Sequence, residues 1–116
     1  MSYVDGFVIP VPKNKIAAYK KMAKLGAKMW LEYGALDYYE CVGDDLNIQG
    51  VIPFGKFAKL KPNETVIFSW IVFKSKAHRN QVNKKVMQDP RMQAYPEMPF
   101  DPKRMTLGGF KVLVKG

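Results

Sequence analysis

Hydrophobic residues change their spacing along this chain of 116 residues, and each spacing predicts a different element. Residues 3–11 (YVDGFVIPV) are rich in β-branched and aromatic types and end among prolines, which is typical of a strand. From residue 13 to 33 apolar side chains recur at steps of three and four, and Gly34 follows them. This second pattern predicts an amphipathic helix that ends at a left-handed glycine.

The next segments predict two strands around a long connection. Residues 35–42 (ALDYYECV) and 65–73 (TVIFSWIVF) both favour strands, and the second is apolar on both sides. Between them, residues 53–60 place two phenylalanines and a leucine at steps of three. That spacing predicts one short helical turn lying on an apolar surface.

The last third of the chain repeats the opening order. Ser75 is a suitable N-cap for a helix that runs to Gln88, where Asp89-Pro90 stops it. The proline-rich residues 89–103 are expected to be ordered but irregular, and residues 105–114 predict a final strand. The order β-α-β, connection, β-α-β predicts one α+β domain over residues 1–116, with the split βαβ topology of ferredoxin-like domains. We expect an antiparallel four-stranded sheet, in the order 4-1-3-2, with two helices on one face.

Both faces of the predicted sheet are apolar. The first and third strands alternate apolar residues on each side, so two helices on one face would leave the other as a large exposed apolar patch. Soluble proteins cover such a patch with a partner. We therefore expect a homodimer in which two sheets face each other and close a dimeric α+β barrel.

Several short strings, taken together, resemble one family. They are YVDGF (3–7), FSW (68–70), DPRM (89–92), MPFD (98–101), KRM (103–105) and GGF (108–110). In this order they are similar to the YbaA-like proteins, short bacterial proteins of unknown function in the dimeric α+β-barrel superfamily. The resemblance implies the ferredoxin-like fold and a homodimer, and it implies no activity.

Composition narrows the classes of partner. The net charge is +9, which favours anionic partners, so a nucleic-acid-binding module is an alternative function. The third strand lacks the basic, glycine and alternating aromatic signature of RNA recognition modules, so this alternative depends on charge alone. A row of lysines at steps of four indicates a solvated helix face instead: Lys20, Lys24 and Lys28.

Cysteine and histidine are almost absent. One cysteine and one histidine exclude an internal disulfide and a Cys/His zinc site, and we predict no metal and no cofactor. Cys41 has no second thiol beside it and is expected to be buried and inert. No basic-then-apolar start and no stretch of ~20 apolar residues occur, so no membrane role and a cytoplasmic location are expected.

Candidate ligand-binding residues follow from the alternation of the strands. If Val4, Gly6 and Val8 face the helices, then Asp5 and Phe7 face the space between the two sheets of the dimer. The predicted lining of this pocket, which would bind or transform a small apolar or aromatic molecule, is Asp5, Phe7, Glu40, Trp70 and Arg104. Asp5 would be the polar anchor or a general base, and Arg104 the counter-charge. The structural alternatives are core or interface packing for Trp70 and an ion pair of Asp5 or Glu40 with Arg104 or a lysine.

A second alternative function comes from the same superfamily. Its haem-degrading monooxygenases use an asparagine on the first strand, a tryptophan on the third and a histidine on the second helix. The resemblance would place Asp5, Trp70 and His78 in these roles. Asp5 stands where these enzymes have the asparagine, and His78 lies in a polar run, so the favoured interpretation of His78 is a surface residue.

Gly108 and Gly109, inside the last strand, predict a close approach or a bulge.

Overall fold

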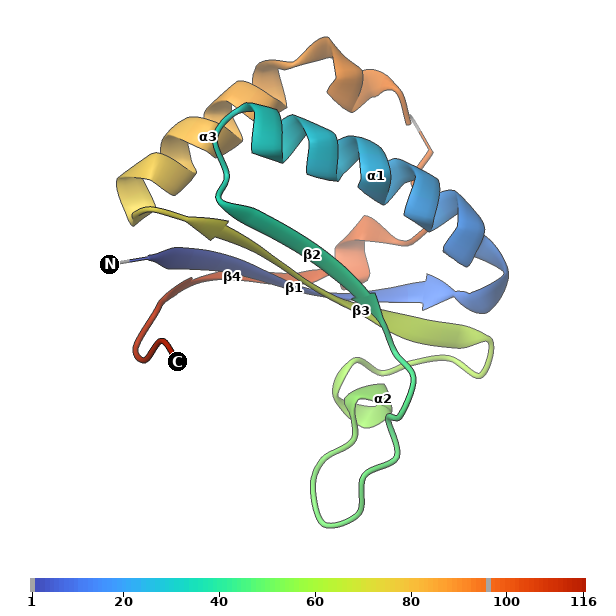
Figure 1. Cartoon of the computed structure of the whole chain (residues 1–116). Helices are drawn as coiled ribbons and strands as arrows, with labels where there is room; N and C mark the ends of the chain where they lie inside the picture. Colours follow the sequence, from blue (N-terminus) through green and yellow to red (C-terminus); the bar gives the residue numbers. More distant parts are fainter. Residues whose placement is uncertain (1, 96) are drawn as a thin grey trace.

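Two long helices cover one face of a four-stranded antiparallel sheet in the computed structural model, which describes residues 2–95 and 97–116 (Figure 1). The strands are β1 (Tyr3–Pro12), β2 (Asp37–Val42), β3 (Glu64–Phe73) and β4 (Thr106–Lys111). The helices are α1 (Ile16–Glu32), the short α2 (Phe54–Phe57) and α3 (Lys76–Gln88), with 3-10 turns η1 (Lys13–Lys15), η2 (Pro90–Gln93) and η3 (Pro102–Arg104). The strand order β2-β3-β1-β4 confirms the predicted topology.

Local sequence signals set the ends of the helices. The Ser75 hydroxyl accepts a hydrogen bond from the His78 backbone N–H at 3.1 Å, so Ser75 is the N-cap of α3 as predicted. Gly34 follows α1 with a φ of 114°, a conformation that glycine adopts without strain. In the proline-rich segment, the carboxylates of Asp89 and Asp101 cap η2 and η3 by accepting from backbone N–H groups.

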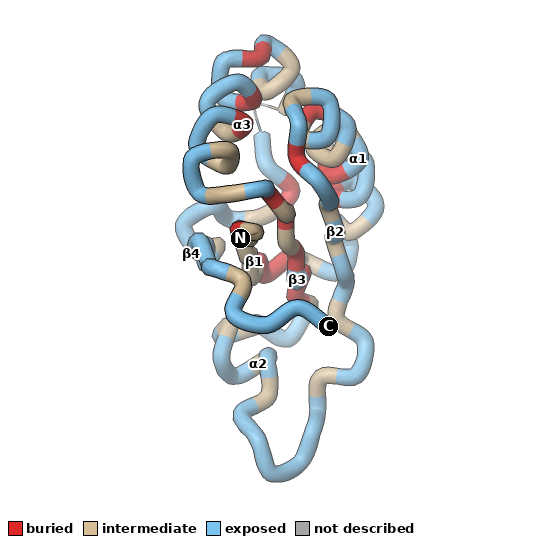
Figure 2. Tube along the Cα trace, turned by 60° about the vertical axis from the view of Figure 1, so that its left-hand side comes forward, coloured by how far each residue is buried: buried red, intermediate tan, exposed pale blue. Residues whose placement is uncertain are grey.

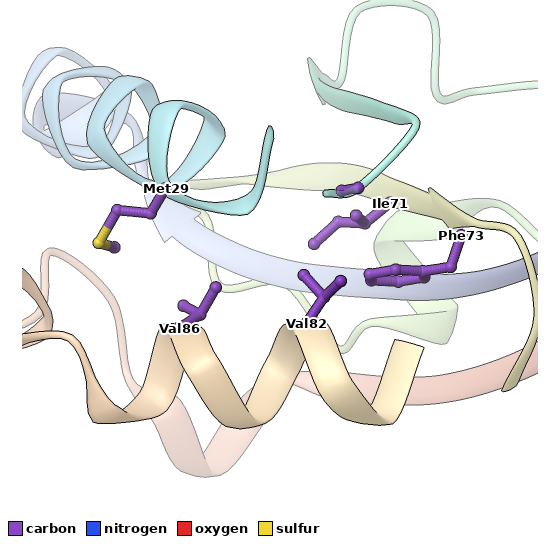
Figure 3. Packing of buried hydrophobic residues seen from close by; sticks show 6 residues of the cluster. Met29, Ile71, Phe73, Val82 and Val86 are labelled. Carbon is purple, nitrogen blue, oxygen red and sulfur yellow. The ribbon is translucent and has the colours of Figure 1, made fainter. Parts of the chain in front are cut away.

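The core lies between the helices and the sheet. One cluster joins α1, α3 and β3 through Met29, Ile71, Phe73, Val82 and Val86 (Figure 3). A second cluster, nearer the start of α1, contains Ile9, Val11, Tyr19, Ala23 and Ile67. Figure 2 shows the buried positions gathered along β1, β3 and the facing sides of α1 and α3.

The two faces of β1 are the reverse of the prediction. Asp5 accepts a hydrogen bond from Asn83 of α3, and Ile9 packs with Tyr19 of α1, so the side of β1 that carries Asp5, Phe7 and Ile9 faces the helices. Gly6 lies on the other face, where an added Cβ would come within 3.2 Å of the Phe110 ring. The predicted helix contact at Gly6 is therefore wrong, because this glycine admits an aromatic ring of β4.

The open face of the sheet is aromatic. Tyr39 stacks on Trp70 with ring centroids 4.9 Å apart, and Phe68 lies against Trp70 at 5.6 Å. Phe54 of α2 contacts Phe68 at 6.0 Å, and Figure 1 shows α2 and the C-terminus on this side of the sheet. Phe68 is 44% exposed and Phe110 59% exposed. The prediction that the two helices leave a second apolar face uncovered is confirmed.

Candidate functional site

A cavity of about 510 Å³ lies between the helices and the sheet. Its floor is formed by the helix-facing side of the strands, its walls by α1 and α3, and its cover by residues from 91–95 and 98–105. Met87, Met98 and Leu107 line it and are each more than 40% exposed, so the cavity reaches the surface there. This volume is in the usual range of small-molecule sites.

Methionine is the most frequent residue type in the lining. All six methionines among the described residues line the cavity: Met22, Met29, Met87, Met92, Met98 and Met105. The thioether side chain is unbranched, flexible and polarisable, so such walls adapt to ligands of different shape. Sequence reasoning missed this feature, because the six residues come from three separate segments.

Glu40 forms one polar group in this apolar wall. Its two carboxylate oxygens accept hydrogen bonds from the Tyr19 hydroxyl at 2.6 Å and the Tyr38 hydroxyl at 2.7 Å. Burial, followed by the hydrogen bond to Glu40, raises the pKa of Tyr19 far above its usual range. Burial and the charge of Glu40 raise the pKa of Tyr38 in the same direction. Both phenols therefore remain donors at neutral pH.

Asp5 and Arg79 form a second polar group at the β1–α3 side of the cavity. Asp5 is only 3% exposed and accepts a hydrogen bond from the Asn83 amide at 3.1 Å. The Arg79 guanidinium lies 3.7 Å from the Asp5 carboxylate, donates to the Tyr3 hydroxyl at 3.2 Å and stacks over the Tyr3 ring. The Trp30 indole N–H donates to the Asn83 amide oxygen at 2.9 Å.

A cluster of charges fixes the start of the covering segment. Asp89 accepts hydrogen bonds from the Tyr33 hydroxyl at 2.7 Å and from both the backbone and the side chain of Arg91. Arg91 also bridges to Glu32 at 2.8 Å. The hydrogen bonds from the Arg91 guanidinium hold the pKa of Asp89 far below its usual range. These contacts tie residues 89–91 to the end of α1.

The structure brings together three of the five predicted ligand-binding residues. Asp5, Phe7 and Glu40 line the cavity beneath the helices, on the opposite side of the sheet from the predicted inter-sheet space. Trp70 pairs with Gly6 and lies on the open face, so the prediction that it shares a site with Asp5 is wrong.

Arg104 is also placed elsewhere. It donates to Glu64 at 2.6 Å and to the Lys59 backbone carbonyl at 2.9 Å, so its predicted pairing with Asp5 is wrong. The hydrogen bond from Arg104 lowers the pKa of Glu64. The structural partner of Asp5 is Arg79, and the partners of Glu40 are tyrosines, neither of which the sequence analysis named.

The three residues of the haem alternative do not converge within one chain. Asp5 and Trp70 lie on opposite faces of the sheet, and His78 Nδ1 accepts a hydrogen bond from the Lys74 backbone at 3.0 Å. The prediction of a buried thiol at Cys41 is wrong. Cys41 is exposed, because it pairs with Phe68 and lies on the open face of the sheet.

Two smaller predictions are confirmed. The lysine row on α1 is solvent-exposed at every predicted position: Lys20, Lys24 and Lys28. Gly109 lies directly beneath the Tyr3 ring, so the predicted close approach in β4 is present.

Among the described residues there is no group of three or more His, Cys, Asp or Glu side chains placed to hold a metal ion. No helix in that part of the chain is long and apolar enough to cross a membrane.

Comparison with known proteins identifies the family. Residues 2–102 match the family model described as a protein of unknown function, DUF1428. The chain belongs to this family. It is 46% identical over 115 residues to the uncharacterized protein YbaA of Escherichia coli strain K12, covering 98% of each chain, and equally to YbaA of Shigella flexneri. The resemblance to the YbaA-like proteins is thus confirmed.

A solved structure supports the fold class. The crystal structure of an uncharacterized NIPSNAP domain protein from Burkholderia xenovorans superposes with a TM-score of 0.53 at 12% sequence identity. The match covers 95% of this chain and 93% of the other. At this identity the likeness shows the α+β fold and nothing about activity.

Proposed function

We propose that this protein binds a small, predominantly apolar molecule in the cavity between the sheet and helices α1 and α3. The observation that carries the proposal is the lining of the cavity of about 510 Å³. This lining is apolar and rich in methionine, and it contains two separate polar groups, one around Glu40 and one formed by Asp5 and Arg79. Ligand sites of small proteins typically combine such walls with a few polar groups that orient the ligand. The apolar wall would supply affinity, and the Glu40 and Asp5–Arg79 groups would supply orientation.

A cavity-filling variant tests the proposal. Ala23 is a buried residue of α1 that lines the cavity, whereas Ala18 on the same helix is exposed and lies outside it. We expect saturable binding of the neutral fluorescent probe N-phenylnaphthylamine to the wild type and to Ala18→Phe. We expect Ala23→Phe to bind it at least tenfold more weakly, because the ring occupies the ligand's space.

The control for folding is urea denaturation of all three proteins. Insertion of a ring into a packed region costs about 1–3 kcal/mol, so a folded Ala23→Phe is expected. Equal affinity in the three proteins, or no saturable binding to the wild type, would contradict the proposed site.

We also propose that two copies associate through the open face of the sheet. An apolar groove of about 520 Å³ runs along this face between α2 and β4, and it is bounded by Val8, Phe57, Phe68, Trp70 and Phe110. Aromatic side chains dominate stable interfaces, and this face is continuous across all four strands. Light scattering should give twice the chain mass of 13.3 kDa at micromolar concentration, and a 13.3 kDa particle would contradict the proposal.

The exposed single thiol supports a reducing compartment, and we propose a cytoplasmic location on that ground.

A further inference from the structure

The net charge of the protein is carried entirely by one layer of the structure. The helix layer, which we define as η1, α1 and α3, contains ten basic residues and one acidic residue, so its net charge of +9 equals that of the whole chain. The rest of the chain contains nine basic and nine acidic residues. Because α1 and α3 cover the same face of the sheet, the excess positive charge lies on one side of the molecule (Figure 1).

The lysines of the helix layer are exposed and unpaired. Six lie on η1 and α1 and three on α3, and each of the nine is exposed. Within the described part of the chain, none of them forms an ion pair. The one acidic residue of the layer, Glu32, is bonded to Arg91, and the one arginine, Arg79, lies beside Asp5 beneath the helices. The charge of the nine lysines is therefore available to a partner.

On α1 the lysines share one direction. Since an α-helix has 3.6 residues per turn, four of them fall within an arc of about 100° around the helix axis: Lys20, Lys21, Lys24 and Lys28. The buried residues of α1 lie on the other side of the helix, against the sheet. On α3 the sequence adds further lysines and no acidic residue. Such a surface attracts a polyanion.

The side chains between the lysines narrow the class of polyanion. The two aromatic residues of the helix layer turn inward: Tyr19 is 4% exposed, and Trp30 donates to Asn83. Single-stranded nucleic acid is bound by exposed aromatic rings on which its bases stack, and this surface has none among the described residues. A helix that lies on a membrane inserts its apolar face, whereas the apolar face of α1 is already buried against the sheet.

A nucleic-acid duplex meets these conditions, because its phosphates lie on the outside and are bound by positive charge alone. Contacts that read base sequence most often use arginine paired with guanine, but Arg79 and Arg91 are both in ion pairs. We propose that the helix layer is a docking surface for double-stranded DNA, which it binds through the phosphate backbone without reading base sequence. The nine lysines lie outside the lining of the cavity and on the opposite side of the sheet from the open face. The proposal is therefore independent of the proposed ligand site and dimer.

Fluorescence anisotropy of a short labelled DNA duplex, measured from 50 to 200 mM NaCl, tests the proposal. We expect a Kd of about 10⁻⁴ to 10⁻⁶ M at physiological salt, as is typical of binding to the backbone. A plot of log affinity against log salt should have a slope of about −3.6 or steeper, because each of the four clustered lysines on α1 contributes about 0.9 when it contacts a phosphate. One strand of the duplex alone should bind at least threefold more weakly.

A triple variant locates the surface. Lys20→Gln with Lys24→Gln and Lys28→Gln removes three charges from α1 and keeps residues that favour a helix equally well. We expect the salt slope to become shallower by about 2.7, and the affinity at 50 mM NaCl to fall at least tenfold.

The matched control removes three exposed lysines outside the helix layer: Lys56, Lys61 and Lys115. Their exchange for glutamine lowers the net charge by the same amount and should leave the salt slope unchanged. Urea denaturation of each protein shows that the variants are folded.

Four results would overturn the proposal. They are the absence of duplex binding at 50 mM NaCl, the same change of slope in both triple variants, a single strand that binds at least as tightly as the duplex, and binding only to vesicles. The vesicles are phosphatidylcholine with one third phosphatidylserine, tested by sedimentation at the same salt concentrations. Tighter binding of the single strand would point to the aromatic open face, and binding to the vesicles alone would assign the lysines to a membrane surface.

Discussion

Removal of one tyrosine hydroxyl should produce a stability loss that disappears at alkaline pH. Tyr19 is 4% exposed and donates to Glu40 at 2.6 Å, and its ring packs edge-on against Phe100. Tyr19→Phe keeps the ring and removes only the hydrogen bond. A hydrogen bond to a charged group contributes about 1.5–3 kcal/mol, so we expect a loss of about 2 kcal/mol at pH 7.

The pH dependence follows from the raised pKa values. The pKa of Tyr19 and that of Tyr38 both lie far above the value of about 10 that tyrosine has in the unfolded chain. Above pH 10 the unfolded chain therefore loses protons that the folded chain keeps, and stability falls as pH rises. Each such tyrosine lowers the free energy of unfolding by about 1.4 kcal/mol per pH unit. The wild type should lose about 2.7 kcal/mol per unit from this pair, and Tyr19→Phe about half of that.

The two stability curves should therefore converge. A gap of about 2 kcal/mol that closes at about 1.4 kcal/mol per unit vanishes near pH 11.5. Urea denaturation at half-unit steps from pH 7 to pH 11.5 measures the gap, and ionisation of the lysines affects both proteins equally. Tyr39→Phe, at a half-exposed position on the open face, is the control and should follow the wild type throughout. A gap that stays constant above pH 10 would refute the assignment of Tyr19 as a buried donor to Glu40.

Two further predictions concern contacts outside the cavity. Arg104→Met should lower the urea midpoint at pH 7, because it removes the hydrogen bond to Glu64. Since Arg104 lowers the pKa of Glu64, the variant should also lose less stability than the wild type between pH 5 and pH 3. Identical acid profiles of the two proteins would contradict the ion pair. Phe68→Lys should shift the proposed dimer toward monomer in light scattering, whereas Lys20→Met on α1 should leave the mass unchanged, and an unaltered dimer in Phe68→Lys would place the interface elsewhere.

The fold was predictable because each element carries its own local signal. Period-two and period-three-to-four spacing separates strands from helices, and Ser75 and Gly34 mark helix ends by side-chain chemistry that acts within a few residues. The strand order follows from the split βαβ connection. All of this information lies in segments shorter than 25 residues.

The faces of β1 were not predictable from its own sequence, because both sides are apolar and alternation alone does not distinguish them. The missing signal is on α3. Its buried apolar stripe consists only of Val82 and Val86, so Arg79 and Asn83 beside the stripe must also face the sheet. These two polar residues need a polar group on the sheet, and Asp5 is the carboxylate on β1 that lies beside them: it accepts a hydrogen bond from Asn83 and lies 3.7 Å from the Arg79 guanidinium. Arg104 was misassigned because its true partner, Glu64, is brought to it only by the turn that Asp101 caps.

The two tryptophans test the central claim directly, because they report on opposite faces of the sheet. Trp30 lines the cavity and its indole N–H bonds to Asn83, whereas Trp70 lies on the open face. The indole N–H signals of the nitrogen-labelled protein should be followed by NMR during a titration with N-phenylnaphthylamine. Binding beneath the helices predicts a saturable shift of the Trp30 signal and a Trp70 signal that stays in place. A shift of Trp70 with Trp30 unmoved would contradict the account and place the ligand on the other side of the sheet.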